Sequence, residues 1–396
     1  MTLEEIISSR KLLICVGSGG VGKTTTSAAI ALHAALSGRR TLVLTIDPAR
    51  RLATALGLSQ LDNEERRVPP EHLQKAGLPA DAELYAAMLD TGRSLDALLS
   101  RVAKDEALQK RISENNIYKQ LSHAIAGSQE YVAMERLYDI MEEGRYELVV
   151  LDTPPTKNAL DFLTAPNRLV SFLDETVVQW FLKQAESNGL GGFIIQKSGN
   201  LVFKLLGVLT GGDFIKDLID FFQAFKYLYI GFRDRADKVN KLLREEDTVF
   251  FLITSPEANV LDEAAFFHDK LLEFGMPLKA LVVNRAYQII KDCPLCSEDV
   301  ETLMRQDTIR QISSQSGADE KLMKSTLEKL LNLRRVAKQF NENTRKNIDS
   351  LKNRLHKAEF MACIPLFSEE VYDLEGLARM NSYLFTSSAG ECKATV

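Results

Sequence analysis

Short apolar runs rich in β-branched residues alternate with longer amphipathic stretches along most of the chain. Runs of this kind predict seven strands, at Lys11–Val16, Thr41–Ile46, Leu84–Leu89, Glu147–Leu151, Thr248–Ile253, Lys279–Val283 and Phe360–Ile364. Strands separated by helices are typical of an α/β fold with a doubly wound, mainly parallel sheet. The carboxyl ends of such strands line the ligand crevice. We therefore expect convergence of the residues that follow the strands, Gly17, Asp47, Asp90, Asp152, Thr254, Asn284 and Pro365.

Two long segments interrupt this alternation. Residues 160–245 contain no strand pattern but many aromatic residues punctuated by glycine, which predicts an apolar helical insertion subdomain. Residues 297–358 are highly charged with helical periodicity and predict amphipathic helices. The core is thus divided into residues 1–159 and 246–385, and we expect the small, polar tail at 386–396 to be disordered.

Composition narrows the class of protein. A hydrophobic content of 45% with 26% charged residues is ordinary for a globular protein, and a net charge of −5 argues against nucleic acid as a partner. Five cysteines in 396 residues exclude a disulfide scaffold and suit a reducing compartment. The acidic, polar start lacks the pattern of a secretory signal, so we expect a cytoplasmic protein.

A glycine-rich loop follows the first predicted strand. Residues 17–24 read GSGGVGKT, which fits G-x-x-x-x-G-K-[ST] between a strand and a helix predicted at Thr25–Leu36. Backbone N–H groups of such a loop surround phosphate oxygens at a helix N-terminus, whereas the alternative is a turn that only caps the helix. Lys23 is expected to reach the β- and γ-phosphates and Thr24 to hold Mg²⁺. The predicted ATP-binding residues here are Gly17, Ser18, Gly19, Gly20, Val21, Gly22, Lys23, Thr24 and Thr25.

Two aspartates at strand ends complete the predicted phosphate chemistry. Asp152 ends the run LVVLD and supplies the carboxylate that the Mg²⁺ shell requires, and the rigid TPPT after it suits a segment that senses the γ-phosphate. Asp47, in TIDPARR, is a candidate to orient the attacking water or to accept its proton. Because Pro48 follows it, Asp47 also fits a helix N-cap, and both roles can coexist.

These motifs together resemble the arsenite-pump and tail-anchored-protein-targeting ATPases, a family of deviant-Walker P-loop NTPases. The matching stretches are GSGGVGKTT, DPAR, LVVLDTPPT, VVN at 282–284 and CIPLF at 363–367. The resemblance implies that Asp47 is the catalytic, water-activating carboxylate of a first switch and that Asp152 begins a second. It also implies an adenine site in which Asn284 reads the base edge and a loop closes over it, formed by Pro365, Leu366 and Phe367.

Ser18 departs from the family pattern. That position usually carries a lysine that reaches the nucleotide of a partner subunit, and serine has no positive charge to offer. Our hypothesis is that Arg50 or Arg51 supplies this charge, in cis or in trans, with Lys157 as the fallback donor. The alternative is that the arginines only begin a solvated helix. Because Ser18 lacks this charge, the contact across a dimer, its ATP-driven closure and the hydrolysis rate depend on whether another residue supplies it.

Cys293 and Cys296 form a C-x-x-C pair that can supply two of the four thiolates of a tetrahedral Zn²⁺ site, so zinc would be shared by two chains. The targeting ATPases hold a shared zinc at a similar place. The alternatives are a redox pair, two ordinary surface cysteines and, less favoured because its cysteines lie farther apart in sequence, an iron–sulfur cluster shared by two subunits. We expect Cys15 and Cys363 to be core residues.

In the targeting ATPases the place of residues 160–245 is taken by a helical subdomain with a groove for a client's membrane-spanning helix. A self-contained helical core and a dimer surface are the alternatives for this segment. Arsenite transport is less favoured, because no cysteine lies between Cys15 and Cys293. We predict a Mg²⁺-dependent ATPase that splits the β–γ bond, acts as a homodimer or with a similar subunit, and controls binding of a hydrophobic client. A nucleotide-binding switch with little hydrolysis is a further alternative.

Overall fold

The computed structural model describes residues 2–46, 50–89, 106–115, 128–155, 159–161, 163–167, 233–286, 304–355 and 359–385. Predictions that rest on other residues lie outside this description. They concern Asp47, Lys157, Cys293 and Cys296, most of the apolar insertion, and the tail.

One sheet of eight strands organises the molecule, in the order β3-β4-β2-β5-β1-β6-β7-β8. All neighbouring strands are parallel except the pair β3–β4. The strands are β1 (Leu12–Val16), β2 (Thr41–Thr45), β3 (Arg66–Arg67), β4 (Leu84–Met88), β5 (Leu148–Asp152), β6 (Thr248–Thr254), β7 (Leu278–Ala286) and β8 (Phe360–Pro365). The seven predicted strands are confirmed. The short edge strand β3 was not predicted, because two residues are too few to show a period.

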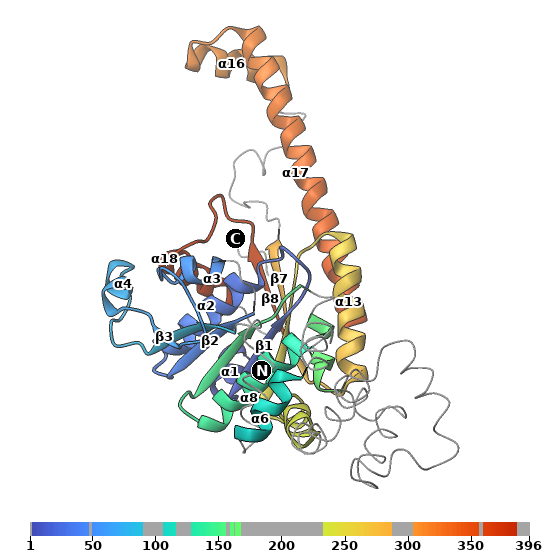
Figure 1. The fold of residues 1–396 in the computed structure, drawn as a ribbon. Coiled ribbons are helices and arrows are strands. Elements are labelled where there is room, and N and C mark those ends of the chain that lie inside the picture. Colours follow the sequence, from blue (N-terminus) through green and yellow to red (C-terminus); the bar gives the residue numbers. More distant parts are fainter. Residues whose placement is uncertain are drawn as a thin grey trace.

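Helices cover both faces of the sheet, as Figure 1 shows. They are α1 (Leu3–Ser8), α2 (Lys23–Leu36), α3 (Arg51–Ala55), α4 (Pro70–Lys75), α6 (Glu106–Glu114), α8 (Ser128–Glu143), α13 (Ala258–Glu273), α16 (Gln306–Ser316), α17 (Glu320–Arg354) and α18 (Leu374–Leu384). Helix α2 begins two residues earlier than predicted, because Gly22 adopts the left-handed conformation that caps it.

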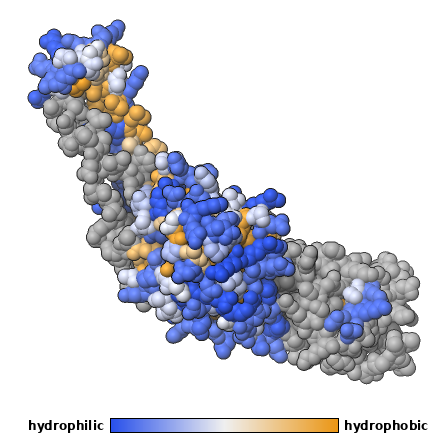
Figure 2. Space-filling model, turned by 90° about the vertical axis from the view of Figure 1, so that its left-hand side faces the viewer, coloured by the Kyte–Doolittle hydropathy of each residue, from blue (hydrophilic) through white to orange (hydrophobic). Residues whose placement is uncertain are grey.

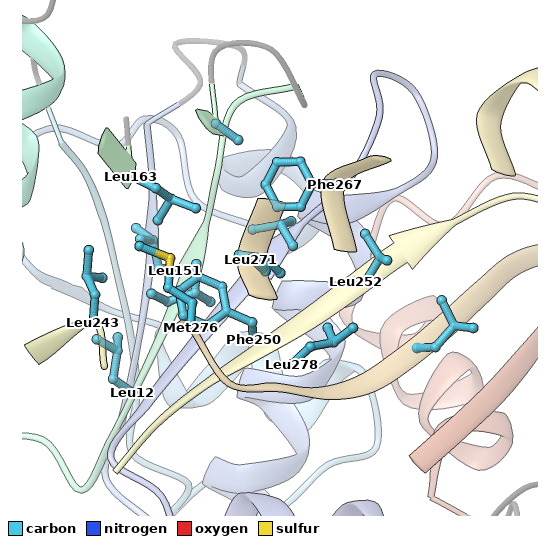
Figure 3. Close-up of a cluster of buried hydrophobic side chains, with 14 of the residues drawn as sticks. Leu12, Leu151, Leu163, Leu243, Phe250, Leu252, Phe267, Leu271, Met276 and Leu278 are labelled. Carbon is cyan, nitrogen blue, oxygen red and sulfur yellow. The ribbon is translucent and has the colours of Figure 1, made fainter. Parts of the chain in front are cut away.

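Successive residues of a buried strand feed two different hydrophobic cores. Leu12, Ile14 and Val16 of β1 pack on one face with α8, α13 and the C-terminal part of α17. Leu13 and Cys15 pack on the other face with α1, α2 and α18. Figure 3 shows part of the first core, where side chains from several strands and α13 meet. Because all five residues of β1 are buried, its sequence is an apolar run rather than an alternation.

Helices α16 and α17 form an arm that projects from the sheet (Figure 1). With 35 residues, α17 is about 52 Å long, and Asp319 caps its start by accepting bonds from the backbone N–H groups of Lys321 and Leu322. These helices confirm the amphipathic pattern predicted between 297 and 358, as far as that range is described. No helix in the described part of the chain combines the length and apolar character that crossing a bilayer requires.

Candidate nucleotide-binding site

The glycine loop between β1 and α2 is enclosed by the neighbouring strands. Gly17 has a φ of 152°, and a Cβ built on it would lie 2.0 Å from the carbonyl oxygen of Ile253 in β6. Gly22 has a φ of 92°, and its Cβ would lie 2.3 Å from Nδ2 of Asn284. Both positions therefore require glycine. Glycines at the N-terminus of a helix allow backbone N–H groups to approach phosphate oxygens, which is the role predicted for this loop.

Lys23 is the first residue of α2, and its side chain is buried against the loop. Its ammonium group donates a hydrogen bond of 2.9 Å to the backbone carbonyl of Ser18. The positive charge is thus held within the loop that begins at Gly17, where a phosphate would also lie. Ser18 is itself buried, and the remaining predicted loop residues, Gly19, Gly20, Val21 and Thr25, lie in the same loop or in the first turn of α2.

The carboxylate of Asp152, at the end of β5, joins three elements of the fold. Its Oδ2 atom accepts hydrogen bonds from the hydroxyl of Thr24 in α2, at 2.7 Å, and from the hydroxyl of Thr45 in β2, at 3.0 Å. Asp152 is only 1% exposed. A carboxylate and two hydroxyls provide the oxygen ligands that Mg²⁺ prefers, so the donor set fits this ion.

Thr45 is a candidate site residue that sequence analysis missed. It lies opposite Asp152 in the parallel pairing of β2 with β5, which brings the two side chains together. The available signal was a threonine at the end of an apolar strand, two residues before the candidate catalytic Asp47. A threonine in that position is common in strands, so the pattern did not indicate this role.

The segment after β5 lies against the end of β1 and against the glycine loop. The backbone N–H and the hydroxyl of Thr153 both donate to the carbonyl of Cys15, at 3.3 and 2.8 Å. A Cβ on Gly19 would lie 3.7 Å from the Cβ of Pro155. The segment predicted to sense the γ-phosphate is thus placed against the loop predicted to hold it.

Asn284 lies at an irregularity near the end of β7, where the pairing with β8 shifts between Val283 and Ala286. Its Nδ2 donates to the carbonyl of Val21 at 2.9 Å, and its Oδ1 accepts from the backbone N–H of Arg285, which has a φ of 57°. The bulge therefore turns the amide toward the glycine loop. Its role toward adenine stays a prediction.

The predicted adenine loop follows β8 and lies beside the end of β7. Pro365 pairs with Ala286, and the N–H of Leu366 donates to the carbonyl of Ala286 at 3.1 Å. The Leu366 side chain is 58% exposed, whereas the Phe367 ring packs against Tyr383 and Arg379 of α18. The fold thus brings this loop close to Asn284.

The remaining residues singled out by the sequence are two exposed arginines, two buried cysteines and two cysteines that the structure does not describe. Arg50 and Arg51 are exposed at the start of α3, and their charge-donating role stays a prediction. Cys15 and Cys363 are buried in strands, as predicted, and burial raises the pKa of the Cys15 thiol to about 12. Among the described residues, no cluster of three or more His, Cys, Asp or Glu side chains is suited to a metal ion. Cys293 and Cys296 are not among them.

Comparisons with known proteins agree with this geometry. The family model described as anion-transporting ATPase matches residues 10–330. Relatives include the ATPase ASNA1 homolog 1 of Paramecium tetraurelia, 24% identical over 75% of this chain and 82% of its own length. The ATPase get3 of Aspergillus terreus is 26% identical over 72% of this chain and 76% of its own. The putative arsenical pump-driving ATPase 1 of Aquifex aeolicus is 24% identical over 69% of this chain and 63% of its own length. The P-loop architecture of the present chain and its match to the family model show that it belongs to the anion-transporting ATPase family.

Proposed function

We propose that this protein hydrolyses ATP at the β–γ bond with Mg²⁺ and uses its nucleotide state to control the binding of a hydrophobic client. One observation carries the proposal: Asp152 accepts hydrogen bonds from both Thr24 and Thr45, at the carboxyl edge of the sheet where the glycine loop begins. A Mg²⁺ ion held by Thr24 and Asp152 would neutralise charge on the phosphate oxygens.

The other predicted residues have separate roles in this proposal. Lys23, buried beside the loop, balances the charge of the β- and γ-phosphates. Asp47 orients or deprotonates the attacking water, two residues after Thr45 in the chain. Asn284 and the loop 365–367, which the fold places side by side, hold the adenine.

Contacts at both ends of the apolar insertion support a link between nucleotide and client. Residues 159–167 follow the segment that contacts the glycine loop, and Asn240 donates from Nδ2 to Oδ1 of Asn167 at 2.8 Å. Arg235 forms ion pairs with Glu135 and Asp139 of α8. The two ends are therefore joined to each other and to the core. A movement of the segment after β5 would thus displace residues that are directly connected to the insertion.

Arsenite or another oxyanion is the second candidate cargo, and one relative's name mentions an arsenical pump. A soft metalloid needs accessible thiolates, but Cys15 is fully buried with its pKa raised to about 12 by burial. No other cysteine precedes Cys293 in the sequence. These observations favour the hydrophobic client.

Nucleotide titration by calorimetry tests the site. Mg²⁺-ATP is expected to bind the full-length protein, and Lys23→Ala and Asp152→Asn are each expected to weaken binding at least about tenfold, since charged contacts are lost. Unchanged binding in both variants would refute the proposed site.

Single-turnover hydrolysis separates an enzyme from a regulator that only binds. We expect measurable cleavage that Asp47→Asn abolishes while ATP still binds. Cleavage at the same rate in Asp47→Asn would contradict the catalytic role of Asp47, and no cleavage by the unaltered protein would favour the binding switch.

Client binding and assembly have their own tests. A leucine-rich synthetic peptide long enough to span a bilayer is expected to bind the protein differently with ATP and with ADP, and equal binding would contradict the switch.

We further propose a homodimer with a shared Zn²⁺ at Cys293 and Cys296. Metal analysis is then expected to give about one zinc per two chains, lost in Cys293→Ser with Cys296→Ser.

A further inference from the structure

Arg285, near the end of β7, has an unusual backbone conformation. Exposed arginines are ordinary on this molecule, whose body is largely hydrophilic in the view of Figure 2. Arg285 differs because its φ is 57°, and in the part of the chain that the structure describes no other residue except glycine has a positive φ. Glycine adopts this left-handed conformation readily, whereas a residue with a Cβ is strained in it. Since strain of this kind gathers at functional sites, the Arg285 side chain is a candidate for a functional role.

A bulge in the pairing of β7 with β8 holds this conformation. The pairing shifts between Val283 and Ala286, so that Asn284 and Arg285 together lie opposite a single residue of β8. The Oδ1 atom of Asn284 accepts a hydrogen bond of 2.9 Å from the backbone N–H of Arg285. A glycine would fit this backbone with less strain. The bulge therefore explains the conformation but does not explain why the residue is an arginine.

Arg285 stands between the two loops that are proposed to hold ATP. Its neighbour Asn284 donates to the carbonyl of Val21 in the glycine loop at 2.9 Å. Its other neighbour, Ala286, accepts from the N–H of Leu366 in the adenine loop at 3.1 Å. The Arg285 side chain is exposed, and its guanidinium forms no hydrogen bond or ion pair with any residue that the structure describes. A long cation is thus available where the two loops approach each other.

Two parts of ATP attract a guanidinium, the phosphates and the face of the adenine ring. The strand order β5-β1-β6-β7 decides between them. Asp152 of β5 marks the proposed Mg²⁺ end of the nucleotide, and β7 lies three strand spacings away, about 14 Å across the sheet. Lys23 and the N-terminus of α2 already supply positive charge for the phosphates. Asn284, which is proposed to read the adenine edge, is the direct neighbour of Arg285, so the base is the nearer ligand.

A guanidinium adds a contact that the rest of the proposed adenine site lacks. Asn284 is proposed to contact the edge of the ring, and the loop 365–367 is proposed to close over it with backbone groups. The guanidinium is planar, permanently charged and weakly hydrated, so it stacks on aromatic faces and gains a cation–π attraction there. A glycine at position 285 would relieve the backbone strain but could not provide this contact.

We propose that Arg285 is a further nucleotide-binding residue, whose guanidinium stacks on the face of the adenine ring while Asn284 contacts its edge. This inference rests on the proposed function and adds a residue that sets the affinity for the base. Stacking involves the ring and not the phosphates. Arg285 therefore contributes to the binding of ATP and contributes nothing to the binding of a phosphate chain without a base.

Calorimetric titrations of the full-length protein with Mg²⁺-ATP and with Mg²⁺-tripolyphosphate test the inference. We expect Arg285→Ala to weaken ATP binding about tenfold, as for the loss of a stacked partner, and to leave tripolyphosphate binding unchanged. Lys23→Ala is expected to weaken both ligands, because both contain the phosphate chain. The matched control is Arg335→Ala, which removes an exposed arginine of α17 and is expected to change neither affinity.

Two further substitutions separate stacking from a structural role. Glycine tolerates the φ of 57°, so Arg285→Gly should unfold at an equal or higher urea concentration while its ATP affinity falls about tenfold. An arginine that only stabilised the fold would lower the urea midpoint and the affinity together. Arg285→Lys keeps the charge but not the plane, so it is expected to recover only part of the affinity that Arg285→Ala loses.

Several results would overturn the inference. Unchanged ATP affinity in Arg285→Ala, or a lower urea midpoint in Arg285→Gly, would do so. Equal weakening of ATP and tripolyphosphate would assign Arg285 to the phosphates, and full affinity in Arg285→Lys would show that charge alone matters. ATP binding that Lys23→Ala weakens and Arg285→Ala does not would refute this inference alone. No ATP binding by the unaltered protein would refute the proposed function as well.

Discussion

Replacing Gly17 by alanine tests the geometry of the glycine loop most directly. The added Cβ would lie 2.0 Å from the carbonyl oxygen of Ile253, whereas real Cβ contacts are essentially never shorter than 3.0 Å. The obstacle is backbone in the central strand β6, so no side chain can rotate away. The loop or the strand must therefore move by at least about 1 Å, in a sheet whose neighbouring strands are hydrogen-bonded.

The expected loss in the free energy of unfolding combines two effects. Forcing an extra carbon into a packed site costs about 1–3 kcal/mol, and holding alanine at a φ of 152° costs about 1–3 kcal/mol more. We therefore expect Gly17→Ala to lose about 2–6 kcal/mol. Because the displaced loop is the proposed phosphate cradle, ATP binding is expected to weaken at least about tenfold in the fraction that remains folded.

Two neighbouring glycines provide an internal scale. In Gly22→Ala the Asn284 side chain can rotate away, but it then loses its hydrogen bond to Val21. This loss and the left-handed φ together should lower the free energy of unfolding by about 2–3 kcal/mol. In Gly19→Ala the Cβ meets Pro155 at an ordinary 3.7 Å, and the change should stay within about 0.5 kcal/mol.

Urea unfolding followed by circular dichroism gives the free energies, and calorimetry gives the ATP affinities of the three alanine variants. The order of destabilisation should be Gly17→Ala, then Gly22→Ala, then Gly19→Ala. If Gly17→Ala is as stable as Gly19→Ala, the loop does not lie against β6 as described, and the reasoning fails.

Three further predictions follow from the contacts of buried side chains. Thr45→Val removes one hydrogen bond to the Asp152 carboxylate while it keeps the shape of the side chain. The Mg²⁺ concentration needed for half-maximal ATP binding should therefore rise about tenfold. An unchanged Mg²⁺ requirement would exclude a positioning role for Thr45. Arg235→Met removes the guanidinium partner of Glu135, which is 1% exposed, and is expected to lower the free energy of unfolding by about 3 kcal/mol in urea titrations. An unchanged free energy of unfolding would show that this ion pair does not stabilise the fold. Burial raises the pKa of Cys15 from 9.0 to about 12, so its contribution to stability is complete below pH 9 and is lost as the pH rises toward 12. Thiol labelling at pH 8 should therefore require unfolding of the core around Cys15, and rapid labelling of Cys15 in the native protein, identified by mass spectrometry, would contradict this.

The strands were predictable because their information is local. Each of the seven runs is short, apolar and bounded by polar or glycine residues, as expected for strands covered by helices on both faces. Strand β3 could not be predicted, since Arg66 and Arg67 become a strand only by pairing with Ala86 and Tyr85 of β4.

The glycine loop, Lys23, Thr24 and Asp152 could be proposed as site residues from sequence motifs, and the structure brings Thr24 and Asp152 into contact. Thr45 could not, because its role depends on lying opposite Asp152, 107 residues away in the chain. The contact between Asn284 and Val21 likewise depends on the bulge at the end of β7, which no local pattern indicated.

Helix α17 shows the same division. Its helical periodicity could be predicted, since it depends only on neighbouring residues. The packing of its C-terminal part against α13 depends on contacts between elements far apart in the chain. The sequence alone thus predicted the fold class, the glycine loop after β1 and the amphipathic helix. Only the tertiary structure decided which side chains meet, because this depends on contacts between residues far apart in the chain.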